Sequence, residues 1–151
     1  MKVLIDADAC PVREETLRVA ARYRVPTVIV SNGGIRPSRD PLVQVVVVPT
    51  GADAADDRIV QECDAGDIVI TADIPLAARV LEKNGAALGP TGRAFDETTI
   101  GMALAMRDLK QRVREETQTQ TRNRAFTQAD RSTFLQALDR LLSAASRRSP
   151  K

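Results

Sequence analysis

Aspartates stand where apolar runs of the chain end. Asp6 and Asp8 close the stretch KVLIDADACP, Asp73 follows DIVIT, and Asp56 and Asp57 are adjacent in GADAADDRIV. Carboxylate oxygens are the ligands that Mg²⁺ and Mn²⁺ prefer in proteins. If these segments meet, the five aspartates form a divalent-cation site, with Asp6 and Asp73 as the candidate catalytic pair.

The aspartates other than Asp6 also have a structural alternative, which is capping of a helix. Asp8 and Asp73 each precede a predicted helix that they can cap, and one aspartate of GADAADD is expected to cap the helix that follows it. Asp6 comes too early in the chain to cap. Two carboxylates about 4 Å apart repel by about 4 kcal/mol at an effective dielectric of 20, so a converging set must share a proton or a cation. No lysine lies between Lys2 and Lys83, which favours the cation.

Further polar side chains are candidate substrate contacts. Ser31 and Asn32 end the second predicted strand, and Thr71 ends the fourth. Arg36 and Arg39 lie in the loop after Asn32, where a guanidinium can contact phosphate. The alternative for both arginines is an exposed loop charge.

The composition excludes several classes of site. The chain has no histidine, which removes Ser-His-Asp and Cys-His catalysis and histidine-rich metal sites. Cys10 and Cys63 have no zinc-binding spacing and are predicted to be buried thiols. The length of 151 residues, 43% hydrophobic, fits one soluble domain. Because no apolar stretch is long enough for a membrane span and no signal peptide is visible, we expect a cytoplasmic protein with no membrane partner.

Charge is distributed unevenly along the chain. Residues 1–106 carry 11 basic and 15 acidic side chains, whereas residues 107–151 carry 11 basic and 5 acidic ones. Most of the basic residues are arginines, which suit forked contacts to phosphate. An acidic body with a basic tail fits a metal site beside a surface that binds a polyanion. The alternative is a solvated helical surface.

Strand-like and helix-like segments alternate. The β-branched run VQVVVV predicts a strand buried on both faces, and Thr127 with Asp130 resembles a capping box. Residues 117–124 form a polar loop to which no role is given. We expect one domain over residues 1–146 and a frayed tail over 147–151. The predicted strands are 2–6, 26–31, 43–48, 67–71 and 86–88, and the predicted helices are 11–23, 53–65, 74–84, 97–116 and 126–145.

Alternation of this kind predicts a three-layer α/β/α sandwich with a mostly parallel five-stranded sheet and helices at the carboxyl end of the chain. Right-handed crossovers place the carboxyl ends of the parallel strands on one edge. Ligands of such sheets bind at that edge, where the strand order reverses. Asp6 and Asp73 are therefore expected to meet there if the first and fourth strands are neighbours.

The quoted motifs resemble a known family. DADACPV, GADAADDRIV, GDIVITADIPLAARVLEKNGA and FTQADRSTFLQALDRLL together are similar to the bacterial YaiI/YqxD family, over nearly the whole chain. That family has no assigned activity, and its fold is regarded as similar to the PIN domain of metal-dependent nucleases. The resemblance implies a sheet ordered 3-2-1-4-5 and an acidic Mg²⁺ or Mn²⁺ site.

By this likeness Asp6 matches the first-strand aspartate of PIN domains, and Asp73 matches the strand-four motif. Asp56 and Asp57 match the acidic motif of flap endonucleases. Two positions depart from those patterns: Ala54 stands where the flap-endonuclease motif begins with glutamate, and Pro75 stands where a second aspartate follows strand four. Fewer carboxylates weaken the case for a two-metal site.

The resulting hypothesis is a divalent-metal-dependent nuclease that hydrolyses phosphodiester bonds, with RNA favoured over DNA by family analogy. One alternative is a non-catalytic protein that binds RNA or a nucleotide. Another is a haloacid-dehalogenase-like phosphatase, in which Asp6 would be the nucleophile, but such enzymes need a lysine before the late acidic motif. Base stacking on aromatics is disfavoured, because aromatic residues are 3% of the chain. The sequence leaves the oligomeric state open.

Overall fold

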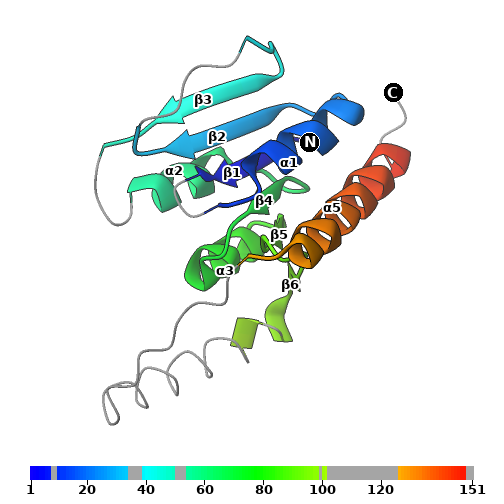
Figure 1. Ribbon diagram of the computed structural model, residues 1–151. Helices are drawn as coiled ribbons and strands as arrows, with labels where there is room; N and C mark the ends of the chain where they lie inside the picture. Colours follow the sequence, from blue (N-terminus) through cyan, green and yellow to red (C-terminus); the bar gives the residue numbers. More distant parts are fainter. Residues whose placement is uncertain (8–9, 34–38, 50–53, 99, 102–125, 149–151) are drawn as a thin grey trace.

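A mixed sheet covered by helices forms the body of the protein (Figure 1). The structure is a computed structural model that describes residues 1–7, 10–33, 39–49, 54–98, 100–101 and 126–148. The elements in chain order are β1 (Val3–Asp6), α1 (Arg13–Arg22), β2 (Thr27–Ser31), β3 (Val43–Val47), α2 (Ala54–Glu62), β4 (Ile68–Ile70), α3 (Ile74–Glu82), β5 (Ala86–Leu88), β6 (Ala94–Phe95) and α5 (Gln128–Arg148).

The sheet confirms the predicted strand order. Within the described residues it has six strands, ordered β3-β2-β1-β4-β5-β6. The pairings from β3 through β5 are all parallel. β6 is added antiparallel to β5, where the sequence indicated only a loop. The expected five-stranded parallel core is therefore present, with one short strand at its edge.

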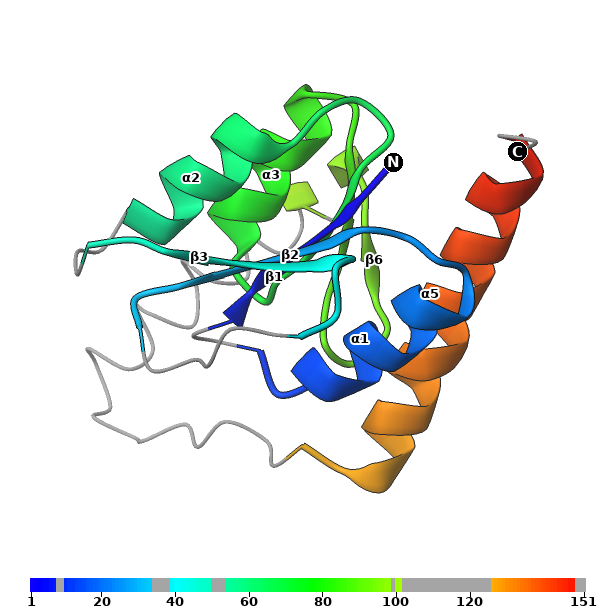
Figure 2. The ribbon, with the colours of Figure 1, turned by 90° about the horizontal axis from the view of Figure 1, so that it is seen from above.

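Helices cover both faces of the sheet, so the molecule has the expected three layers (Figure 2). α2 and α3 lie on one face, and α1 and α5 lie on the other. Side chains of β1 alternate between them: Leu4 packs in the cluster under α2 and α3, and Val3 and Ile5 pack under α1 and α5. Because β1 is covered on both faces, it reads as a continuous apolar run.

α5 packs beside α1 and runs in the same direction. Arg131 Nε lies 2.7 Å from a carboxylate oxygen of Glu15, near the start of both helices. Where α1 ends, beside the middle of α5, the Tyr23 hydroxyl donates to Asp139 at 2.8 Å, and Arg22 pairs with the same carboxylate. Both helices therefore lead away from the carboxyl ends of the parallel strands.

The ends of α5 differ in how well the sequence predicted them. Thr127 and Asp130 form the predicted capping box, in which the backbone N–H of each donates to the side chain of the other at 3.0 Å. The carboxyl end was predicted too short, because the helix continues to Arg148 instead of fraying after residue 146.

Of the predicted helix 97–116, residues 97–98, 100 and 101 are helical. The rest of it and the loop 117–124 lie outside the described residues.

β3 corrects the expectation of burial on both faces. This strand is at the edge of the sheet and pairs with β2. Only Val46 of its five residues is buried, and Val47 is 62% exposed. A β-branched run indicates a strand, but edge and central positions share that composition.

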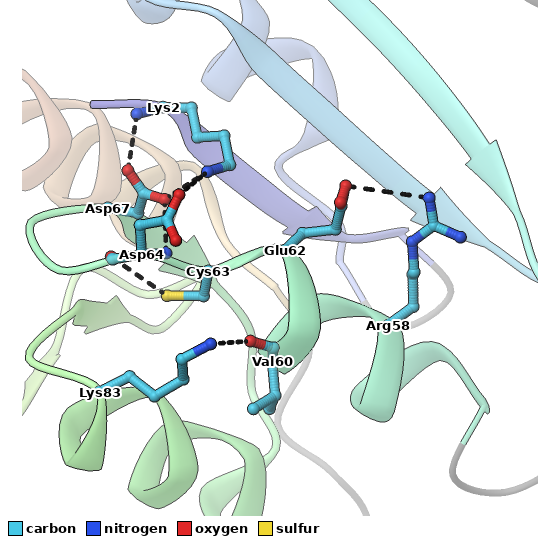
Figure 3. A network of polar contacts seen from close by, with 8 residues as sticks. All are labelled: Lys2, Arg58, Val60, Glu62, Cys63, Asp64, Asp67 and Lys83. Carbon is cyan, nitrogen blue, oxygen red and sulfur yellow. Dashed lines mark hydrogen bonds and ion pairs between the residues drawn. The ribbon is translucent and has the colours of Figure 1, made fainter.

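A polar network ties β1 to β4 at the amino ends of the strands (Figure 3). The Asp67 carboxylate accepts bonds from the Lys2 backbone N–H at 3.0 Å, the Lys2 ammonium at 2.6 Å and the Asp64 N–H at 2.8 Å. Lys83 donates to the Val60 carbonyl at 2.6 Å, which links α3 to α2.

No helix in the described part of the chain is long and apolar enough to cross a bilayer.

Candidate functional site

Strand register brings Asp6 to Thr71. Ile5 pairs with Ile70 across β1 and β4, so the residue after each stands opposite the other. Both side chains extend to the face covered by α2 and α3, because Leu4 and Val69, two residues earlier, belong to that cluster. The Thr71 hydroxyl donates to Asp6 Oδ2 at 2.9 Å, and the two residues are 6% and 1% exposed. Asp6 is thus a buried carboxylate at a strand end, as the sequence indicated.

Asp73 lies next to this pair and begins α3. Its backbone N–H donates to Thr71 Oγ1 at 3.0 Å, and its Oδ1 accepts from the Leu76 N–H at 3.0 Å. The second bond makes Asp73 the N-cap of the helix. The capping alternative for Asp73 is therefore confirmed, while its half-buried side chain stays at the edge that holds Asp6.

The position of this cluster in the sheet is the one where ligands of such folds bind. From β1 the chain proceeds to β2 and β3 on one side, and β4 and β5 lie on the other side. The strand order therefore reverses between β1 and β4. Asp6, Thr71 and Asp73 stand at the carboxyl ends of those two strands, at the topological switch point of the sheet.

The first turn of α2 holds the next two predicted ligands. Asp56 is half-buried there, whereas Asp57 is exposed and pairs with Arg79 of α3 at 3.0 Å. Arg79 has no local sequence motif that marks it as part of the site. The adjacency of α2 and α3, which decides this pairing, depends on the sheet order rather than on any local motif.

The structure describes four of the five predicted metal ligands. Asp8 lies outside the described residues. Among the residues that are described, no group of three or more cysteine or acidic side chains is arranged to hold a metal ion. What the structure does bring together is the Asp6–Thr71–Asp73 cluster, which offers two carboxylates from neighbouring strand ends.

Ser31 is placed on the face of the sheet opposite Asp6. Ser31 follows Ile29 by two residues, and Ile29 packs under α1 and α5, so Ser31 shares that opposite face. Its hydroxyl is engaged in the turn that follows, because Oγ lies 3.0 Å from both N and O of Gly33. Asn32 is exposed in the same turn.

The loop arginines do not join the site within the described residues. Arg39 is exposed and precedes Asp40, whose carbonyl accepts from the Val43 N–H at 3.0 Å. Val43 begins β3 and pairs with Thr27 at the start of β2, so Arg39 lies near the amino edge of the sheet, opposite Asp6. Arg36 lies outside the described residues.

The cysteines are free thiols, as expected, although only Cys63 is fully buried. Cys10 is half-buried near Asp6. Burial raises the pKa of the Cys10 thiol to about 11, with the Asp6 and Glu15 carboxylates adding to the rise and the Val12 backbone opposing it. A thiol with this pKa stays protonated at neutral pH, so Cys10 is a poor nucleophile.

Comparison with known proteins identifies relatives over nearly the full length. Residues 4–144 match the model of a family described as "Uncharacterized BCR, YaiI/YqxD family". A UPF0178 protein of Mesorhizobium japonicum is 56% identical over 93% of this chain and 90% of its own. Another, of Parvibaculum lavamentivorans, is 52% identical over 99% and 98%. No solved structure matches the chain significantly.

Proposed function

This chain belongs to the uncharacterised YaiI/YqxD family, and we propose that it is a divalent-metal-dependent phosphodiesterase that cleaves nucleic acid, RNA in preference to DNA. The observation that carries the proposal is the buried Asp6 carboxylate at the switch point of the sheet. The Asp6 carboxylate accepts the Thr71 hydroxyl, which offsets part of the cost of its burial, and it stands at the strand end where ligands of such sheets bind.

The residues present fit one cation better than two. Mg²⁺ typically takes one or two carboxylates and keeps several waters, and Asp6 and Asp73 offer that number. Asp57 fits less well as a ligand, because it is exposed and paired with Arg79. Asp8 and Asp56 remain proposed ligands that would complete the site.

In this proposal Asp6 is the principal metal ligand. Asp73 is a second metal ligand and also caps the amino end of α3. A bound Mg²⁺ or Mn²⁺ would supply Lewis-acid polarisation of a phosphoryl oxygen and a water of lowered pKa. The amino end of α3 adds a partial positive charge at the same edge, which favours an anionic substrate. The charge of residues 107–151, 11 basic against 5 acidic, suits a polyanion. The preference for RNA rests on the family resemblance to PIN-like nucleases.

Two observations bear on the alternatives. Asp57 and Asp73 make structural contacts, an ion pair and a helix cap, which is what a non-catalytic binding protein would also show. The phosphatase alternative needs a lysine beside Asp6. The two lysines in the described part of the chain, Lys2 and Lys83, bind Asp67 and the Val60 carbonyl instead.

The first test is thermal unfolding of wild type and Asp6→Asn in EDTA, Mg²⁺ and Mn²⁺. A cation at 100 times its dissociation constant adds about 2.7 kcal/mol of stability, which is about 5–10 °C for a domain of this size. We expect this rise for wild type and none for Asp6→Asn. Asp64→Asn is the matched control, because Asp64 is an exposed aspartate at the opposite edge, and it should respond as wild type does.

The second test is cleavage of end-labelled RNA and DNA of the same sequence. We expect metal-dependent shortening of the RNA by wild type and by Asp64→Asn, and none by Asp6→Asn. Retention of intact RNA on the protein, with Mg²⁺ and Mn²⁺ both present, would favour the binding protein over the nuclease. Absence of any metal effect on wild-type stability would overturn the cation site itself.

A further inference from the structure

We propose that Thr71 is a positioning residue for the candidate site, holding the Asp6 carboxylate in a fixed orientation against the start of α3. The sequence indicated a substrate contact for Thr71. The structure gives it a different part, since its side chain is 1% exposed and engaged with Asp6 and Asp73. The inference deepens the proposed function and rests on it for its catalytic meaning.

The direction of both bonds follows from the donors available. A backbone N–H can only donate, so the Asp73 N–H uses a lone pair of Thr71 Oγ1. The single hydroxyl hydrogen of Thr71 is donated to Asp6 Oδ2. The hydroxyl therefore joins the two groups in one direction, from the helix start to the carboxylate.

Thr71 is itself held in place from a third strand. Its backbone N–H donates to the Leu88 carbonyl of β5 at 3.1 Å. β1, β4, β5 and the amino end of α3 thus converge on this one residue. Although Asp6 and Asp73 lie 67 residues apart in the chain, the Thr71 hydroxyl contacts both of them, in addition to the strand pairing of β1 with β4.

Outer-sphere partners of metal-binding carboxylates commonly control affinity. Loss of such a partner typically weakens metal binding roughly 10- to 100-fold. Thr71→Val keeps the shape of the side chain and removes the hydroxyl, whereas Thr71→Ser keeps the hydroxyl and removes the methyl group. The two substitutions separate orientation of the carboxylate from packing.

The experiment compares wild type with Thr71→Val, Thr71→Ser and Thr27→Val. Thr27 is the control, because it is also a 1% exposed threonine but begins β2 at the opposite edge. Manganese affinity is measured by titration calorimetry with MnCl₂ alone. In EDTA, proton exchange of the Asp73 amide and the carboxyl carbon shift of Asp6 are measured by NMR. Both NMR readouts are independent of cation and of catalysis.

We expect Thr71→Val to bind Mn²⁺ roughly 10- to 100-fold more weakly, to lose amide protection at Asp73 and to shift the Asp6 carboxyl signal. Thr71→Ser should restore all three, and Thr27→Val should change none. Unchanged NMR signals of Asp6 and Asp73 in Thr71→Val would overturn the positioning role. If these signals change but wild type binds no Mn²⁺, the positioning contact stands and the proposed metal-dependent function fails.

Discussion

Asp67 offers a sharp test of the energetics at the amino edge, because Lys2 contacts one buried and one exposed aspartate. The Asp67 side chain is 3% exposed and accepts three bonds. The Asp64 side chain is 81% exposed and accepts the Lys2 ammonium at 3.1 Å. Comparing the two aspartates therefore shows how burial and backbone hydrogen bonds change the cost of removing a carboxylate that pairs with Lys2.

Asp67→Ala should destabilise the fold by about 3 kcal/mol. It leaves the backbone N–H groups of Lys2 and Asp64 without their acceptor, at about 1–1.5 kcal/mol each. The Lys2 ammonium adds less, because its side chain is 24% exposed and stays close to water and Asp64. Asp64→Ala should cost at most about 1 kcal/mol, since it removes an exposed ion pair.

The assay is urea unfolding followed by circular dichroism in EDTA, so that no cation contributes. An unchanged m-value with a lower midpoint would show that the native state lost stability. In thermal unfolding the loss should appear as a fall of about 6–12 °C. Equal costs for Asp67→Ala and Asp64→Ala would refute the reasoning from burial.

Three further predictions concern single contacts. Asp139→Asn should lower the pKa of Tyr23, because the hydrogen bond to Asp139 is the main cause that raises this pKa. The chain has one tyrosine and no tryptophan, so the absorbance of the phenolate measures the pKa of Tyr23 directly. Because folding raises the pKa of Tyr23, the contribution of Tyr23 to the free energy of unfolding should be fully present below the ordinary pKa of tyrosine. This contribution should decline as the pH rises from the ordinary pKa through the raised one. Thr127→Ala should cost about 1 kcal/mol of unfolding free energy through loss of the α5 cap. Gly92→Ala should lower the melting temperature, since Gly92 has φ +91° and a Cβ there would lie 2.8 Å from α5 backbone.

The sequence was sufficient for the parts of the fold that local chemistry decides. The apolar runs marked the parallel strands, and the helix predicted over residues 11–23 is present as α1, with Thr16, Val19 and Ala20 buried and Tyr23 only half-buried. The capping box at Thr127 was readable because its residues lie three apart. Such features need no knowledge of distant partners.

Other features depend on contacts between distant segments. β6 has two residues and no apolar alternation, and only its pairing with β5 makes it a strand. The edge position of β3 follows from the sheet order rather than from its composition. The helix end at Arg148 was missed because polar residues in the last turns resemble a frayed tail.

The same distinction between local features and contacts of distant segments applies to the candidate site. Asp6 and Asp73 were recognisable because both follow buried strands, and the predicted adjacency of those strands is confirmed. The face on which each polar side chain stands required the strand register, which separates Ser31 from Thr71. The Arg79 partner of Asp57 required the packing of α2 beside α3. The metal-binding role of the five aspartates stays a prediction.

The shared direction of α1 and α5 has a practical consequence for tethering the molecule. β1 begins at the amino edge of the sheet, and α5 carries the chain towards the same edge, as its pairing with the end of α1 at Asp139 shows. A linker that tethers the protein to a surface through Met1 or through Arg148 would therefore leave from the side opposite Asp6. Immobilised in this way, the protein would present the switch-point edge outward, open to a long polymer in single-molecule experiments.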